Sequence, residues 1–164
     1  MEIIFRNITL EDAKEVAELE RKCFPKTEAA DLKAFIDRIG AYGNHFLCAE
    51  YEGKIVGLVD GLVTDDKDLK DEMYEDVSFH NENGCWQMIF GVETDPDFQG
   101  KGIASQVLER FIEIAREENR KGLVLTCKEK LISFYQRFGF KNEGISGSKH
   151  GGVSWYQMRL SFFL

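Results

Sequence analysis

Apolar residues recur at the spacing of an amphipathic helix in three long stretches of the chain. The spacing predicts three helices, over residues 9–22, 29–39 and 103–118. Thr9 is expected to begin the first helix as its N-cap, and Pro25 ends that segment because proline cannot continue a helix. Gly40 is expected to cap the second helix at its C-terminal end.

Shorter apolar runs have the length and composition of β-strands. They cover residues 3–7, 46–51, 54–63, 85–94, 123–126, 140–143 and 153–160. Glu52-Gly53 separates the second and third runs and predicts a hairpin, while residues 130–138 predict a short helix that ends at Gly139. This order predicts one α/β (α+β) domain over residues 1–164, built on a mixed sheet.

Residues 64–83 interrupt the apolar pattern with many acidic side chains. Such a run favours a solvated loop or short helices, and a loop that covers a substrate is the alternative interpretation. The chain as a whole carries a formal net charge of -8. This acidity argues against a nucleic-acid partner and against an anionic membrane surface, since both require clustered positive charge.

The start of the sequence and the spacing of its cysteines predict the cellular compartment. The sequence begins without the basic and apolar regions of a secretory signal, and no run is apolar enough to span a membrane. Its four cysteines, Cys23, Cys48, Cys85 and Cys127, are far apart, so we expect free thiols and no metal site. A cytoplasmic location is therefore expected.

The segment between the run 85–94 and the helix 103–118 carries the candidate chemistry. It reads Pro96-Asp97-Phe98-Gln99-Gly100-Lys101-Gly102-Ile103-Ala104, a glycine-rich turn that leads directly into a helix. The first amides of a helix have no internal partner and lie at the positive end of the helix dipole, so the turn is suited to bind an anion. A tight turn without a ligand is the alternative. The nucleoside-triphosphate loop and the dinucleotide fingerprint are both absent.

Two motifs in this chain resemble those of the GNAT N-acyltransferase superfamily. Gln99, Gly102 and Ala104 fit the family's acetyl-CoA pyrophosphate turn, and residues 130–140 resemble its late helix with a Tyr followed by Phe-Gly-Phe. Residues 23–25, the acidic loop and residues 125–135 look like the arylalkylamine (serotonin) N-acetyltransferase branch. The resemblance implies a mixed, mostly antiparallel sheet flanked by helices.

The resemblance also implies roles for individual residues. Acetyl-CoA would be the co-substrate, with its pantetheine arm held by the backbone of Val92, Glu93 and Thr94. Its pyrophosphate would be held by the amides of Gln99, Gly100, Lys101, Gly102, Ile103, Ala104 and Ser105. Tyr135 occupies the family position of the general acid that protonates the leaving thiolate. Without the motif, Tyr135 would be interpreted as a core aromatic.

The general base is left open by the sequence. Met88 and Phe90 occupy positions where the arylalkylamine branch in vertebrates has two histidines, and Met88 cannot accept a proton. The base must lie elsewhere, or ordered water must serve; His80, Glu28, Glu93 and Asp60 are the candidates. His80 is preferred for its ordinary pKa. Phe24, Met88 and Phe90 are assigned to an apolar wall for the acceptor.

Three functions remain open at this stage. The first is acetyl transfer to a small amine, such as an arylalkylamine or a polyamine, and the second is transfer to a peptide N-terminus or a protein lysine. The third is an acyl-CoA-binding module without turnover, which the missing base at Met88 would suit. The negative charge suits a cationic acceptor in both enzymatic cases. A homodimer is possible, since two-fold dimers are the commonest assembly.

Overall fold

The computed structural model describes residues 1–148 and 150–163, which fall into two compact units. Unit 1 comprises Met1–Gly61 and Gly91–Phe111, and unit 2 comprises Leu62–Phe90 and the chain from Ile112 onward. The two units are interleaved along the sequence. Each has a β-sheet of its own, and each is described separately below.

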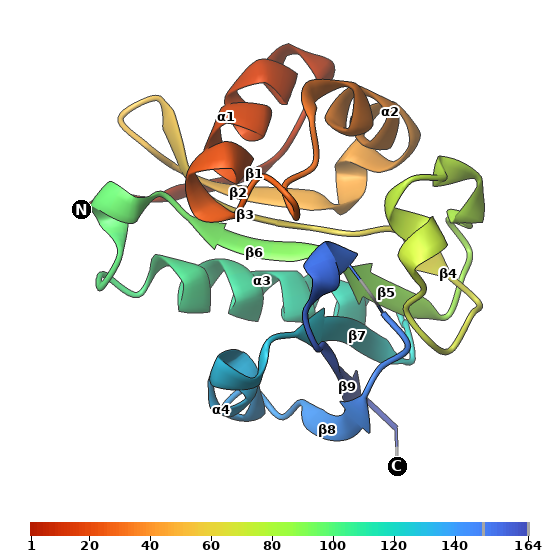
Figure 1. The fold of residues 1–164 in the computed structure, drawn as a ribbon. Coiled ribbons are helices and arrows are strands. Elements are labelled where there is room, and N and C mark those ends of the chain that lie inside the picture. Colours follow the sequence, from red (N-terminus) through yellow and green to blue (C-terminus); the bar gives the residue numbers. More distant parts are fainter. Residues whose placement is uncertain (149, 164) are drawn as a thin grey trace. The chain divides into compact units, whose positions relative to one another are not determined.

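Unit 1 is a four-stranded antiparallel sheet with helices on both faces (Figure 1). Its strands, in spatial order, are β1 (Ile4–Asn7), β2 (Phe46–Tyr51), β3 (Lys54–Asp60) and β6 (Gly91–Thr94). The helices α1 (Ala13–Cys23) and α2 (Leu32–Tyr42) cover one face. The first residues of α3 (Ile103–Glu117) lie on the other face, where Arg110 stacks over the ring of Phe5.

Local sequence explains two boundaries in unit 1. The amide of Thr9 donates a hydrogen bond of 2.9 Å to the Asp12 carboxylate, which fixes the turn that leads into α1. The hairpin between β2 and β3 turns at Glu52 and Gly53, whose φ values are 48° and 79°. Glycine adopts that left-handed conformation readily, which explains the tight turn. The antiparallel pairing of β2 and β3 confirms the predicted hairpin.

The second predicted helix is wrong at both ends. α2 begins at Leu32 rather than Ala29, because the side chain of Asp31 accepts a hydrogen bond of 2.9 Å from the Ala34 amide and caps the helix. It continues through Gly40 to Tyr42, whose ring is fully buried in unit 1. Burial of this large side chain outweighs the weak helix propensity of Gly40.

Two predicted strands are each divided in the structure. The run 85–94 forms β5 (Trp86–Ile89) and β6, which belong to different sheets and are separated by Phe90. The run 54–63 forms β3 and then β4 (Val63–Thr64), which again belong to different sheets. The first run stays apolar at Phe90, so hydrophobicity alone could not show where its pairing partner changes, whereas the second run changes sheets just after Asp60-Gly61.

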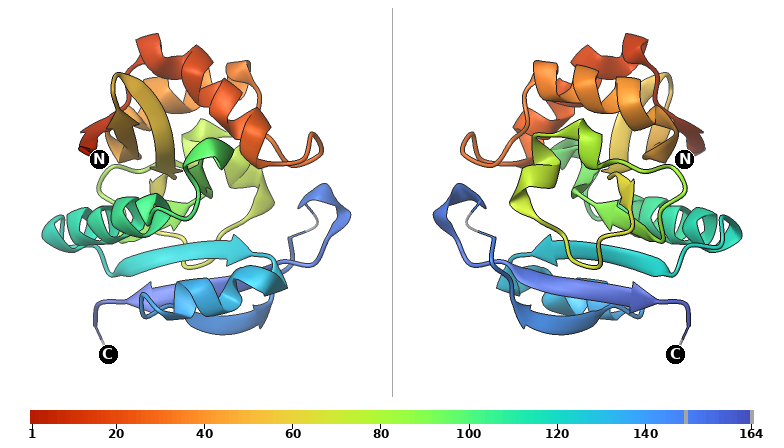
Figure 2. Two further views of the ribbon diagram at one scale, coloured as in Figure 1. Left: turned by 90° about the vertical axis from the view of Figure 1, so that its left-hand side faces the viewer. Right: turned by 90° about the vertical axis from the view of Figure 1, so that its right-hand side faces the viewer.

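Unit 2 is a five-stranded mixed sheet (Figure 2). Its order is β4, β5, β7 (Gly122–Cys127), β9 (Tyr156–Ser161) and β8 (Lys141–Ile145), with β5 and β7 parallel and the other neighbours antiparallel. The predicted helix 130–138 is shorter than expected: a 3-10 turn precedes α4 (Ile132–Gln136), which packs against β8 and β9. The α+β fold with a mostly antiparallel arrangement is confirmed.

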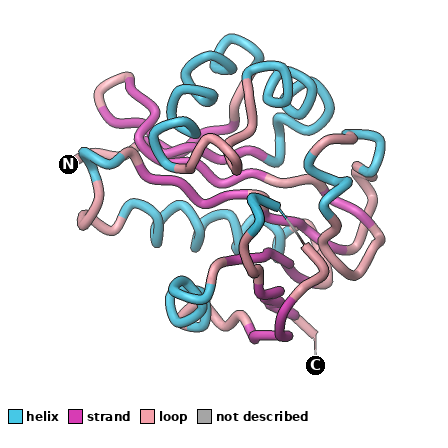
Figure 3. Tube along the Cα trace, viewed as in Figure 1, coloured by secondary structure: helices cyan, strands magenta, loops and turns pink. Residues whose placement is uncertain are grey.

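The acidic segment between β4 and β5 is irregular, as the sequence predicts. Figure 3 shows it as loop with short helical turns, at Asp71–Tyr74 and Val77–Phe79. The four cysteines are free thiols, as expected. Within the described part of the chain, no helix combines the length and the apolar character that a membrane crossing needs.

Candidate active site

The glycine-rich turn of unit 1 holds a row of backbone amides at the start of α3. Gly100 and Gly102 have φ values of 79° and 77°, a conformation that side chains rarely adopt. The first helical hydrogen bond runs from the Gln106 amide to the Gly102 carbonyl at 3.1 Å. The amides of Ile103, Ala104 and Ser105 therefore precede the helical ladder and can serve a ligand.

Asp95 fixes the approach to this turn. Its buried carboxylate accepts a hydrogen bond of 3.0 Å from the Asp97 amide and lies 3.3 Å from Lys54 Nζ and 3.5 Å from Lys22 Nζ. Burial acts to raise the pKa of Asp95, but these donors outweigh it and hold the pKa below its ordinary value. The turn is thus fastened to unit 1 by a carboxylate that stays ionised.

The sheet of unit 1 comes unusually close to the start of α3. A Cβ atom added to Gly57 would lie only 2.8 Å from Ile103 Cγ2, so a larger residue there would displace the Ile103 side chain. Ile103 itself is buried, whereas Gln99, Gly100, Lys101 and Gly102 are exposed. The helix is anchored by its first apolar side chain while the preceding amides remain accessible.

β6 is the last strand of its sheet and pairs only with β3 within it. The register places Val59 opposite Val92 and Leu58 opposite Glu93. One row of backbone groups on an end strand is not used by its sheet. The backbone of Val92, Glu93 and Thr94 can therefore pair with an extended ligand, which is the role predicted for it.

Acidic side chains gather in the interior of unit 1. Glu93 on β6, Asp60 on β3 and Glu20 on α1 are all buried. Neither carboxylate oxygen of Glu93 has an amide, hydroxyl or cation donor among the described residues, and its carboxyl group lies close enough to that of Glu20 to share a proton with it. Arg38 Nη1 lies 3.8 Å from Asp60 Oδ2, too far for a hydrogen bond, and Glu20 accepts one of 2.7 Å from the Ala30 amide. The cluster carries more negative than positive charge.

This crowding changes the proton affinity of the cluster. Burial raises the pKa of Asp60 to about 7; Arg38 opposes the rise and Glu20 adds to it. Burial, together with the neighbouring Glu20 and Asp60, raises the pKa of Glu93 well above its ordinary value. Asp60 can therefore take up and release protons near neutral pH, which is the property of a general base, and Glu93 holds a proton more tightly than an ordinary glutamate.

Gly91 leaves room beside this cluster. A Cβ atom added to Gly91 would lie 3.2 Å from Glu93 Oε1 and 3.8 Å from the ring of Phe24. The ring of Phe24 and the carboxyl group of Glu93 therefore both lie next to Gly91, which has no side chain. Phe24 was predicted to contact the acceptor, and this geometry suits that prediction.

Unit 2 holds the other predicted residues. Tyr135 is buried in α4, with its ring edge-on to those of Phe134 and Phe140 at 5.1 and 5.9 Å. Burial, followed by the effects of Cys127 and Tyr74, raises the pKa of the Tyr135 hydroxyl far above neutrality. Tyr135 is therefore protonated at physiological pH and is able to donate a proton.

The histidine chosen as a candidate base is engaged elsewhere in unit 2. His80 Nδ1 accepts a hydrogen bond of 3.1 Å from the Val63 amide, and Nε2 lies 3.0 Å from Glu82 Oε1. This geometry suits a structural role that joins the acidic loop to β4. Its assignment as the base stays a prediction, and the carboxyl cluster offers stronger candidates.

The two remaining residues that were predicted to contact the acceptor differ in their burial. Met88 is fully buried on β5, whereas Phe90 is half-buried and its ring lies 4.5 Å from that of Tyr74. Tyr74 was missed by sequence reasoning because it stands alone in a polar loop. Glu20 was also missed, although its spacing from Val16 and Ala17 puts it on the apolar stripe of α1, where a charge is unusual.

The chain matches the profile of the acetyltransferase (GNAT) family over residues 13–140. It is 26% identical to serotonin N-acetyltransferase of Mesocricetus auratus over 166 residues, which cover 96% of this chain and 76% of that protein.

Two solved structures share the fold. The loading GNATL domain of CurA from Lyngbya majuscula has a TM-score of 0.85 at 18% identity, with 98% of both chains covered. The PaiA N-acetyltransferase from Thermoplasma acidophilum, solved in complex with coenzyme A, has a TM-score of 0.70 at 16% identity, with 99% of this chain and 100% of that chain covered. Since the family profile spans most of the sequence, the chain belongs to the acetyltransferase (GNAT) family and is an acetyltransferase.

Proposed function

We propose that this acetyltransferase moves the acetyl group of acetyl-CoA to the primary amine of a small cationic acceptor. The observation that carries the proposal is the state of Glu93, a buried carboxyl group beside those of Glu20 and Asp60, whose two oxygens have no amide or cation donor among the described residues. Leaving such a group unsatisfied is costly. An ammonium group would supply both the missing donors and the missing positive charge.

The donor would be held by unit 1. The exposed turn from Gln99 to Gly102 and the first amides of α3 fit a pyrophosphate, and the unused edge of β6 fits the amide groups of a pantetheine arm. The coenzyme A complex of a protein with the same fold supports this assignment. Lys101 adds a cation at the turn, within a chain of net charge -8.

The reaction requires three proton transfers, two from the acceptor nitrogen and one to the leaving sulfur. The acceptor ammonium must lose a proton before its nitrogen attacks the acetyl carbonyl carbon, and Glu93 would take that proton, with Asp60 as a second acceptor. A C–N bond then forms, the C–S bond breaks, and the nitrogen gives up the second proton that the amide product cannot keep, for which Asp60 is the available acceptor. Tyr135 would give its hydroxyl proton to the departing sulfur, since the hydroxyl is protonated at neutral pH.

The acceptor class also follows from the cluster. Glu93 and Asp60 are both buried, with exposed fractions of 2% and 1%, so they favour an acceptor small enough to enter with its charged end first. The ring of Phe24, beside Glu93 in unit 1, is half-buried and suits an acceptor with an apolar or aromatic body. Peptide N-termini and protein lysines are the competing acceptors.

The test is an amine panel with acetyl-CoA, read by release of free thiol. It contains arylalkylamines, polyamines and short peptides, and it compares the natural protein with Glu93→Gln and with Glu109→Gln, an exposed position on α3. We expect turnover with small amines, and a loss of turnover in Glu93→Gln alone. Turnover only with peptides would show that the acceptor is a peptide and not a small amine. Tight coenzyme A binding without turnover on any amine would favour a binding module.

A further inference from the structure

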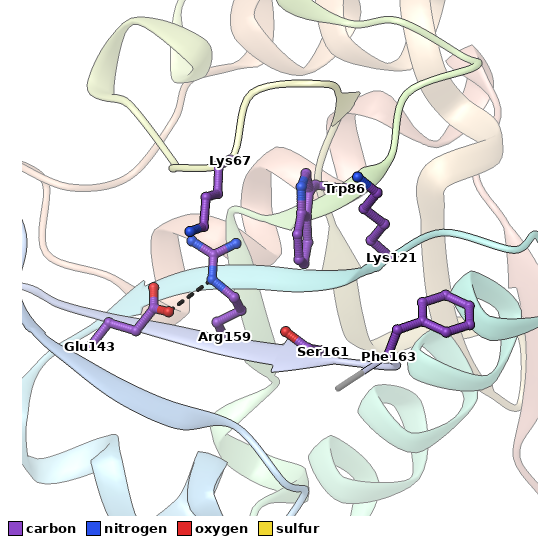
Figure 4. Close-up of a pocket in the computed structure, with 7 residues that line it drawn as sticks. All are labelled: Lys67, Trp86, Lys121, Glu143, Arg159, Ser161 and Phe163. Carbon is purple, nitrogen blue, oxygen red and sulfur yellow. Dashed lines mark hydrogen bonds and ion pairs between the residues drawn. The ribbon is translucent and has the colours of Figure 1, made fainter.

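An open hollow lies on the sheet of unit 2, and none of its residues has a role in the proposed reaction. Its volume is about 530 Å³, and its lining includes Trp86, Arg159, Ser161 and Phe163, with Lys67, Lys121 and Glu143 at its border (Figure 4). This volume falls within the range of sites for small ligands. The hollow therefore calls for an explanation of its own.

The sheet register explains why the surface is hollow there. Trp86 on β5 lies opposite Gly122 on β7, and Gly122 lies opposite Ser161 on β9. The middle strand thus contributes no side chain between an indole ring and a hydroxyl group. A side chain could not replace the glycine, because a Cβ atom at Gly122 would collide with the backbone of Leu160. The gap is enforced by the backbone of β9.

Arg159 presents an unsatisfied donor at this place. Its guanidinium lies 4.7 Å from the centre of the Trp86 ring. Nε donates to Glu143 Oε2 at 2.9 Å and Nη2 donates to Asp68 Oδ1 at 3.0 Å. The third nitrogen, Nη1, is buried and has no hydrogen-bond partner among the described residues. Two carboxylates fix the plane of the guanidinium, and its remaining nitrogen has no acceptor among the described residues.

Two lysines add positive charge to the border. Figure 4 shows the ammonium group of Lys67 pointing toward the Arg159 guanidinium, and Lys121 beside the Trp86 ring. Both lysines are exposed, and neither forms an ion pair with a residue that the structure describes. Cations that face one another repel, and an anion between them removes the repulsion. Such a cluster is unexpected in a chain of net charge -8.

We propose that this hollow binds a small planar anion, an aromatic ring or nucleobase that carries a carboxylate or phosphate. The ring lies against Trp86 and Phe163, and the anionic group lies between Lys67 and Arg159, with the Ser161 hydroxyl as a further donor. The ligand has the opposite charge from the acceptor proposed above. The hollow is therefore a second site, and it does not depend on the identity of the acceptor.

The test uses Trp86 as the reporter. The chain has two tryptophans, so Trp155→Phe leaves Trp86 as the only one, and its fluorescence is followed with saturating coenzyme A present to occupy the donor site. The probes are benzoate and adenosine monophosphate. Benzamide is the uncharged match for benzoate, and inorganic phosphate is the anion without a ring.

We expect saturable quenching by benzoate and adenosine monophosphate, with much weaker binding of benzamide and phosphate. In a second protein that also carries Lys67→Glu and Lys121→Glu, the dissociation constant should rise at least about tenfold, or roughly 1.4 kcal/mol. Lys14→Glu with Lys26→Glu changes the net charge equally at exposed positions of unit 1 and should leave the affinity nearly unchanged.

Three results would overturn the proposal. They are an absence of saturable quenching, equal affinity for benzamide and benzoate, and equal losses in the two charge-reversed proteins. Tight binding of phosphate alone would also contradict it, because the ring would then contribute nothing. The comparison of benzoate with benzamide needs no variant in the hollow itself, so the test does not depend on how the lysine variants fold.

Discussion

Lys54 Nζ lies 3.3 Å from the buried carboxylate of Asp95, and this ion pair joins the β2–β3 hairpin to the segment that leads into the glycine-rich turn. The ring of Phe98 lies below the same ammonium group, 5.7 Å from it, and edge-on to Tyr51. The β2–β3 hairpin, which the turn at Gly53 predicts, thus also fixes the position of the proposed acetyl-CoA site.

Replacing Asp95 should loosen that turn. Asp95→Ala removes the acceptor for the Asp97 amide and the partner of Lys54 and Lys22, so we expect a loss of about 1–3 kcal/mol in the free energy of unfolding. The KM for acetyl-CoA should rise more than kcat falls. Asp97→Ala is the matched control, because its side chain is exposed. Equal effects of the two substitutions would contradict this.

The same carboxylate predicts a pH dependence. The pKa of Asp95 is held below its ordinary value in the folded state, so the stability it contributes is present above the unfolded-state pKa of about 3.9. That contribution is lost as the pH falls through the folded-state pKa. Urea unfolding at a series of acidic pH values should show the natural protein and Asp95→Ala converging in stability as the pH falls.

Gly102 and Gly40 should respond in opposite directions to alanine. Gly102→Ala forces a side chain into a φ of 77°, which costs about 1–2 kcal/mol, and it should weaken coenzyme A binding in calorimetry. Gly40 lies inside α2 with no heavy atom within 4 Å of an added Cβ, so Gly40→Ala should stabilise the fold by about 0.5–1 kcal/mol. If Gly40→Ala also weakened coenzyme A binding, the loss in Gly102→Ala could not be assigned to the glycine-rich turn.

Glu93→Gln should stabilise the protein while it reduces turnover. The pKa of Glu93 is raised in the folded state, so its ionisation opposes folding increasingly as the pH rises above the unfolded-state pKa of about 4.3. The gain should be near zero at about pH 4 and of the order of 1–3 kcal/mol near pH 8. Thermal unfolding at both pH values measures it. A loss of stability at pH 8 would mean that Glu93 has a cation partner in the free protein.

Tyr135→Phe separates chemistry from binding. Removal of the hydroxyl should lower kcat by about 10²- to 10⁴-fold, the range for a general acid, and leave the dissociation constant of coenzyme A nearly unchanged. The ring stays in place, so its contacts with Phe134 and Phe140 persist and the fold should be as stable as before. An unchanged kcat would remove Tyr135 from the mechanism.

Much of the fold could be predicted, because most elements carry their own local signal. The stripe of α3 and the turn at Gly53 depend only on nearby residues, and both were predicted correctly. The division of the run 85–94 at Phe90 was not predictable from hydrophobicity, since apolar residues continue on both sides of it. Which strand pairs with which is decided by contacts between residues far apart in the sequence.

The site was predictable to a different extent in its two parts. The turn from Gln99 to Ser105 can be predicted from the sequence, because its glycine spacing and the start of the helix depend only on neighbouring residues. The carboxyl cluster does not, because Glu20, Asp60 and Glu93 come from three elements and each is an ordinary acidic residue in sequence. The raised proton affinity of Asp60 and Glu93 arises only when folding removes the carboxyl groups from water together.

The chain changes units three times, after Gly61, Phe90 and Phe111. Neither unit is a continuous stretch of gene. A recombination event with one crossover after Phe111 would deliver the complete sheet of unit 1, but with it β4 and β5 of the other sheet. One crossover therefore cannot exchange either unit between related genes without part of the other.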